Sequence, residues 1–151
     1  MSSLAFTCLL SELRMKDFVV RYYRLHAMLH AKIQKINENK YACIIGHKSN
    51  ETREIPINSI LYIETKSRKT LIHTEEGCFI SDEKINDLEN RLEPYGFYRS
   101  HKSYLTNMAK VEYIDKEFAY FKDNEKSYVS VRKYAETKKR YIAAKKKIAA
   151  M

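Results

Sequence analysis

The chain has 151 residues, enough for one domain with a short appendage, and 44% of them are apolar, so a buried core is feasible. Its 28 Lys and Arg against 19 Asp and Glu give a net charge of +9, which favours an anionic partner. Nucleic acid is the first expectation and an anionic membrane surface the second. Three widely spaced cysteines (Cys8, Cys43, Cys78) exclude a disulfide framework, and no apolar run approaches membrane-spanning length. We expect a cytoplasmic protein without a signal peptide.

The first predicted element is an amphipathic helix from about Thr7 to Asn37. Apolar side chains recur there at spacings of three and four, at Tyr22, Leu25, Leu29, Ile33 and Ile36. A polar cluster then ends the pattern, so residues 1–40 are expected to form a helical extension. The apolar stripe of this helix needs a partner, which is either the following domain or a second copy of the chain.

From Tyr41 the sequence becomes a series of short segments rich in Ile, Val, Tyr and Phe, separated by polar or glycine-containing turns. One short helix, Glu83–Arg91, interrupts them and is followed by Pro94 and Gly96 as stop signals. So many short strands predict a mainly β (α+β) fold, an elongated antiparallel β sandwich of small sheets with one internal helix. The predicted strands are Tyr41–His47, Glu54–Ile57, Ile60–Thr65, Lys69–Thr74, Cys78–Ser81, Phe97–Ser100, Lys110–Asp115, Glu117–Lys122 and Ser127–Val131.

The last predicted element is a basic helix that begins near Arg132. Residues 132–148 contain eight Lys or Arg and a single acid, Glu136. The helix is expected to run into a basic tail, residues 142–151.

The segment Phe97–Asn107 alternates apolar or aromatic side chains with hydrogen-bond donors and contains no carboxylate. Such a segment can pack on one side and offer only donors and cations on the other, which suits a phosphate backbone with base edges between the phosphates. The alternative is a strand with a solvated cationic edge.

Two other segments have similar chemistry. The loop Thr65–Thr70 carries three cations and three hydroxyls, so its lysines can contact phosphates while Arg68 reaches a guanine edge. The alternative for this loop is an ordinary solvated β-turn. Ser130–Tyr134 lies where the last strand meets the terminal helix, and Arg132 at that boundary is able to project into a groove.

Four blocks of the sequence resemble the LytTR DNA-binding domain, the output half of many bacterial response regulators. These blocks are Ile60–Glu64, Thr65–Lys69, Phe97–Asn107 and Tyr128–Arg132. The resemblance runs from about Tyr41 to Tyr141, and its F-x-R-x-H-x-S core is fairly specific. Within the family, the chain looks most like the regulators of peptide-pheromone quorum sensing and virulence in low-GC Gram-positive bacteria.

The resemblance implies a LytTR-like domain over residues 41–141 whose loops enter successive major grooves of promoter DNA and bend it. It also implies imperfect direct repeats occupied by two molecules in tandem. Base contacts are expected from Arg68, Lys102 and Arg132, and phosphate contacts from Lys66, Ser67, Lys69, Arg99, His101, Ser103 and Lys133. Several relatives carry Asn or Arg at the position of Lys102. This departure bears on base choice, because Asn prefers adenine and Lys prefers guanine.

The segment Met15–Arg21 and the helix that follows are similar to the last strand and helix of a receiver domain, with Arg21 at the position of its usual lysine. The remaining residues cannot supply the rest of a receiver. The chain is therefore interpreted either as a truncated regulator or as one without phospho-control; a plain helical extension is the simpler alternative.

No convincing catalytic constellation is present. Glu64 and Lys66 match half of a nuclease E-x-K motif, but no clear acidic partner precedes them, and Glu64 is expected to face solvent at a strand end. His26 and His30 have the spacing of a metal pair without a third ligand. His73 is expected to be a strand residue with its hydrogen bonds satisfied. We therefore expect no enzyme, no metal or other cofactor and no small-molecule substrate.

The leading hypothesis is a sequence-specific transcription regulator that binds and bends double-stranded promoter DNA. The first alternative is a magnesium-dependent nuclease that uses Glu64 and Lys66. The second is a regulator that acts through protein contacts of its N-terminal helix.

Overall fold

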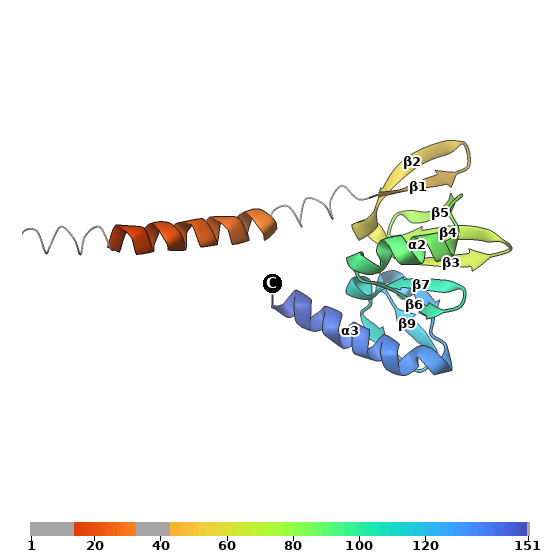
Figure 1. Ribbon diagram of the computed structural model, residues 1–151. Coiled ribbons are helices and arrows are strands. Elements are labelled where there is room, and N and C mark those ends of the chain that lie inside the picture. The colour runs from red at the N-terminus through yellow and green to blue at the C-terminus, as the bar shows by residue number, and fades with distance from the viewer. Residues whose placement is uncertain (1–13, 33–42, 151) are drawn as a thin grey trace, which may run out of the picture. The chain divides into compact units, whose positions relative to one another are not determined.

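The computed structural model describes residues 14–32 and 43–150, and the chain divides into two units, residues 1–40 and 41–151 (Figure 1). In the first unit, residues 14–32 form a helix whose residues are all exposed. This confirms the predicted N-terminal helix over those residues; the rest of the prediction, including Ile33 and Ile36, lies outside the described residues. None of the helices in the described ranges is both long and apolar enough to cross a membrane.

The second unit contains two antiparallel sheets, as the predicted mainly β fold requires. The larger sheet has seven strands in the order β2-β1-β5-β4-β3-β7-β6, and the smaller has three in the order β10-β9-β8. The strands are β1 Cys43–Lys48, β2 Glu51–Pro56, β3 Ile60–Lys66, β4 Lys69–Thr74, β5 Gly77–Ser81, β6 Phe97–His101, β7 Tyr104–Asn107, β8 Tyr113–Ile114, β9 Phe118–Tyr120 and β10 Lys126–Tyr128.

Two helices belong to the same unit, α2 (Ile85–Leu92) and α3 (Tyr134–Ala149), and a 3₁₀ turn, Val131–Lys133, leads into α3. Both helices were predicted: the ends of α2 differ from the prediction by one or two residues, and α3 begins two residues after the predicted start. Strand β7 was not expected as a separate strand, because the turn before it contains neither glycine nor proline. The predicted strand Lys110–Asp115 is reduced to β8, since residues 108–110 form a 3₁₀ turn that Asn107 caps by accepting a hydrogen bond from the Ala109 amide.

The two faces of the large sheet have separate cores. On one face, α2 covers the central strands, and its Leu88 and Leu92 pack with Ile63, Ile72 and Leu105. These strand residues alternate with others that point to the opposite face, as the period of two in a β-strand dictates.

The opposite face packs against the small sheet and α3. Tyr62 belongs to this second core, together with Phe121 and Val129 of the segments around β9 and β10 and with Tyr141 of α3. Three buried hydroxyls also join the sheets, since Thr106 bonds to Ser100 within the large sheet and to Ser127 of β10, both at 2.8 Å. Both sheets are thereby held in one fixed arrangement.

Candidate nucleic-acid interface

The first candidate turn joins β3 to β4. Lys66 and Lys69 are paired across the two strands, so the turn itself has only two residues, Ser67 and Arg68. Both residues have positive φ, 51° and 64°, a conformation that turns of this kind usually give to Asn and Gly. All four side chains are exposed, and three of them are cationic. The hairpin therefore presents Arg68 at its tip with a lysine on each side.

The second turn joins β6 to β7, and exposed Lys102 occupies its tip. The Ser103 amide donates to Nδ1 of His101 at 3.1 Å, so this nitrogen carries no proton and the neutral ring keeps its N–H on Nε2. Burial lowers the pKa of His101, and the charges of Lys102, Arg99 and Lys133 lower it further. The turn thus combines one cation with a neutral imidazole donor.

The third turn is the 3₁₀ segment Val131–Lys133, in which Val131 is 88% exposed and Arg132 is also exposed. Lys133 is only partly exposed: its Nζ donates to the carbonyl of Arg99 at 2.8 Å and lies 5.7 Å from the centre of the Tyr98 ring. Arg132 is therefore the residue that projects from this turn, while Lys133 fastens the turn to β6.

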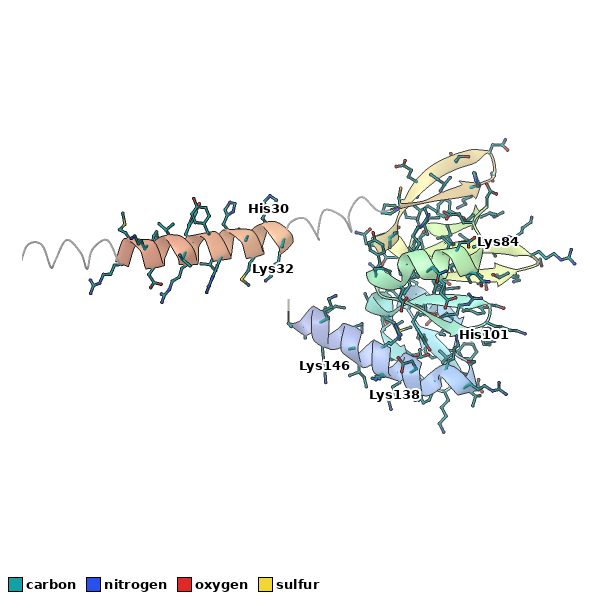
Figure 2. All side chains as sticks on the ribbon, in the orientation of Figure 1. His30, Lys32, Lys84, His101, Lys138 and Lys146 are labelled. Atoms are coloured by element: carbon teal, nitrogen blue, oxygen red, sulfur yellow. The ribbon has the colours of Figure 1, made fainter. Side chains whose placement is uncertain are left out.

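Backbone hydrogen bonds connect these three turns. The Thr65 amide, beside the first turn, donates to the carbonyl of Ser103 in the second at 2.8 Å. The Ser130 amide, before the third turn, donates to the carbonyl of Ser100 at 2.9 Å. Because β3 and β6 both run antiparallel to β7, the first two turns lie at the same end of the sheet. Figure 1 shows the β3–β4 tip and the start of α3 on the same side of the unit, and Figure 2 shows His101 there.

Arg99 is engaged within the protein. Its guanidinium donates to the side chains of Asn86 at 3.0 Å and Glu89 at 2.8 Å, both on α2. It also donates to the carbonyls of His101 at 3.1 Å and Lys102 at 3.0 Å, and only 12% of the side chain is exposed. A phosphate contact by Arg99 stays a prediction, and this side chain is not presented in the way that Arg68 and Arg132 are.

A half-buried polar cluster lies behind the first two turns. Oε1 of Glu64 lies 3.1 Å from Nε2 of His73, and burial together with a hydrogen bond to Glu64 raises the pKa of Tyr104. The Tyr62 ring stacks on His73 with ring centres 4.3 Å apart, and its hydroxyl donates to Glu125 at 2.8 Å. The pKa of Tyr62 is raised, chiefly by burial and by this hydrogen bond.

This cluster corrects one expectation. The Glu64 side chain is only 12% exposed, whereas solvent exposure was expected at the strand end. The reason is that His73 on β4 and Tyr104 on β7 flank Glu64 from the two neighbouring strands. His73 has Glu64 as its partner, in agreement with its expected role in a strand. Among the described residues, no three His, Cys, Asp or Glu side chains are grouped to hold a metal ion.

Two features at this end of the sheet were not identified from the sequence. The first is the aromatic cluster of His101, Tyr104, Tyr128 and Phe118, with neighbouring ring centres 4.6–6.0 Å apart. Its signal in the sequence was the high content of aromatic residues, 12 Tyr and 6 Phe, which favours strands with half-buried aromatic faces. The second is exposed Lys84, just before α2 (Figure 2). Strand β5 runs parallel to β3, so it ends at the same end of the sheet as the first turn.

The chain is similar to proteins described as transcriptional regulators. The transcriptional regulatory protein YpdB of Escherichia coli K12 and that of Shigella flexneri are each 30% identical to the chain over 63 residues, 42% of this chain and 26% of theirs. The chain thus spans about a quarter of the length of these relatives.

A solved LytTr DNA-binding domain, from a Bacillus cereus protein described as a methyl-accepting/DNA response regulator, superposes with a TM-score of 0.60 at 20% identity. The match covers 67% of this chain and 96% of that domain, which shows a common fold. The family model of the LytTr DNA-binding domain matches residues 50–142, a span that includes all three turns. The chain belongs to the LytTr DNA-binding domain family.

Proposed function

We propose that the chain is a sequence-specific transcription regulator whose three turns enter successive major grooves of promoter DNA and bend it. The observation that carries this proposal is that Arg68, Lys102 and Arg132 are exposed on turns connected by backbone hydrogen bonds. Arginine and lysine at such tips suit the O6 and N7 acceptors of guanine in the major groove. Because the turns are fixed relative to one another, the three side chains meet the DNA with a fixed spacing.

Phosphate contacts come from the residues beside these tips. In the first turn, Lys66 and Lys69 flank Arg68, and Ser67 offers a hydroxyl donor. In the second turn, Ser103 offers a hydroxyl and His101 the N–H on Nε2. These contacts set the register of the protein on the duplex without carrying sequence information.

Tandem occupancy of imperfect direct repeats follows from the small number of base contacts. One base-contacting side chain in each turn distinguishes only a few base pairs, and each correct pair contributes about 1–3 kcal/mol of discrimination. Two copies on adjacent repeats double this discrimination. We infer that the DNA-bound form contains two molecules placed in tandem.

The decisive experiment is the selection of bound duplexes from a random pool. We expect an enriched motif present twice in direct orientation, with the bend visible as position-dependent gel mobility of the complex. The control is a variant with Arg68, Lys102 and Arg132 all replaced by Ala, which should keep its far-UV CD spectrum and enrich nothing. Binding without any enriched motif would overturn the proposal of sequence specificity.

The same complex, incubated with magnesium, tests the nuclease alternative. The bound DNA is expected to stay intact, because the Glu64 carboxylate is paired with His73 and is flanked by residues of the two neighbouring strands. Cleavage that disappears in the Glu64→Ala variant would favour the nuclease instead.

A contribution from protein contacts is favoured by the exposed apolar side chains of the helix at residues 14–32. Phe18 and Leu25 are each 67% exposed, and Leu29 is 59% exposed. We expect a second copy to cover this stripe, giving dimers in light scattering that the Leu29→Glu variant breaks. A wild type that stays monomeric at high concentration would contradict this assignment.

A further inference from the structure

Strand β6 departs from regular pairing immediately before the second turn. Tyr98 pairs with Thr106 and His101 pairs with Tyr104, so the register shifts by one residue between the two pairs. The shift is a β-bulge at Arg99 and Ser100. Bulges bend the strand locally and change the direction in which a side chain points. Arg99, in this bulge, is the residue whose side chain reaches α2.

The Arg99 side chain joins α2 to the backbone of the second turn. Nη1 donates to Asn86 and Glu89 on the helix, and Nε donates to the carbonyls of His101 and Lys102. Nη2 also donates to the carbonyl of Lys102. All three guanidinium nitrogens are therefore in use, and the pairing with the Glu89 carboxylate, at 2.8 Å, is charge-assisted.

We infer that Arg99 is a positioning residue, which fixes the backbone of the second turn and so directs Lys102 toward its base. This inference rests on the proposed function, because it assigns a role within the same DNA-binding end. A phosphate at Arg99 would have to replace Glu89 or a backbone carbonyl. Each such loss leaves a partly buried polar group without its partner, which is costly.

The two roles predict opposite effects when Glu89 is replaced by Gln. If Arg99 positions the turn, loss of the carboxylate loosens the turn and reduces discrimination between the selected site and other DNA. If Arg99 contacts phosphate, loss of the carboxylate frees the guanidinium and tightens binding to every duplex. Glu83→Gln is the matched control, because Glu83 loses the same charge but is paired with Arg91, at 2.8 Å, and not with Arg99.

The first measurement uses the free protein and amide hydrogen exchange. The amides to follow are those of Ser103, bonded to His101, and of Thr65, bonded to the carbonyl of Ser103. We expect both to exchange roughly tenfold faster in Glu89→Gln than in Glu83→Gln, since local opening becomes easier. Equal exchange in the two variants would overturn the positioning role.

The second measurement uses the duplex obtained by selection and a scrambled duplex of the same length, over a range of salt. Arg99→Lys keeps the charge but cannot bridge two carbonyls and two side chains, so we expect the affinity ratio of selected over scrambled DNA to fall about tenfold at an unchanged salt slope. A preserved ratio in Arg99→Lys, or tighter binding of both duplexes by Glu89→Gln than by Glu83→Gln, would overturn the inference.

The two measurements also separate this inference from the proposed function. A wild type that binds neither duplex contradicts the proposed function, while the exchange comparison in the free protein still decides whether Arg99 holds the turn.

Discussion

Arg132 projects from the third turn as an exposed side chain, next to a lysine that is fastened to β6. We predict that Arg132→Ala costs about 1–3 kcal/mol of binding free energy on the selected site, because a bidentate contact to guanine is lost. Specificity should relax at one base position only. Binding titrations against a set of single-base variants of the site measure this. Equal weakening on every sequence would show that Arg132 touches phosphate alone.

Lys66 and Lys69 face each other across the β3–β4 hairpin on either side of its tip. We predict that Lys66→Ala weakens binding to all duplexes alike and flattens the dependence of log K on log salt by about 0.9, since one phosphate contact is lost. Lys69→Ala should behave in the same way. Titrations of selected and scrambled DNA at several salt concentrations check this, and a loss confined to the selected site would assign these lysines to bases.

His101 gives the second turn a dependence on pH. Burial and neighbouring cations lower its pKa in the folded state, so the unfolded chain takes up a proton first as the pH falls. The contribution of His101 to stability is therefore complete above the ordinary pKa, about 6.5, and is lost as the pH falls toward the lowered value. Protonation of Nδ1 also breaks the hydrogen bond from the Ser103 amide.

We predict that the free energy of unfolding of the wild type decreases between pH 7 and pH 5 more than that of the His101→Gln variant. Urea unfolding at a series of pH values measures the difference between the two proteins. Parallel curves would show that His101 does not contribute to this pH dependence.

At the scale of elements, the strands were predictable because a short apolar run bounded by polar turn residues is a local signal. Strand β3 begins with four consecutive buried apolar residues, of which Ile60 and Ile63 face the core under α2 while Leu61 and Tyr62 face the second core. The turn before β7 was not predictable in this way, since its shape depends on the Arg99 side chain and on hydrogen bonds to Thr65 and His101.

In the candidate site too, the features that depend on neighbouring residues in the sequence were predictable, and those that depend on distant residues were not. The exposure of Arg68 and Arg132 was predictable from the sequence, because cations in turns between predicted elements are usually exposed. The engagement of Arg99 could not be identified, because its partners Asn86 and Glu89 lie 13 and 10 residues away, on a helix whose packing depends on the whole sheet. The shielding of Glu64 was missed for a similar reason, since the residues that flank it come from two other strands.

The β3–β4 hairpin places two residues without special backbone freedom at positive φ. Since this conformation costs an ordinary residue about 1 kcal/mol, we predict that Arg68→Gly raises the free energy of unfolding by about 0.5–1 kcal/mol. The same variant should lose affinity for the selected site. Lys69→Gly, in the adjoining strand, should instead lower stability by about 0.5–1 kcal/mol.

Urea unfolding of these two variants, together with DNA titrations, tests the arrangement. If Arg68→Gly were destabilising, the left-handed turn would not be under strain in the protein. If it kept full affinity for the selected site, Arg68 would not be a base contact.

At the scale of the whole second unit, the cations of the three turns lie at one end and those at the end of α3 lie at the other. Helix α3 starts at the third turn and runs back along β6: the Arg140 guanidinium lies 4.4 Å from the centre of the Tyr98 ring, and Lys147 lines a pocket with Gly96 and Met108. Lys146 and Lys147 are exposed, and Figure 2 shows Lys146 on the side of the unit away from His101.

We predict that replacing Lys146 and Lys147 with Gln leaves the salt slope of DNA binding unchanged, because these lysines lie at the end of the unit opposite the three turns. The matched control, Lys66 and Lys69 replaced by Gln, removes the same charge beside the first turn and should lower the slope by up to about 1.8, because each phosphate contact contributes about 0.9. Titrations of both double variants from low to physiological salt measure the two slopes. A slope lowered as far in the variant at Lys146 and Lys147 as in the control would show that the bound DNA reaches the end of α3.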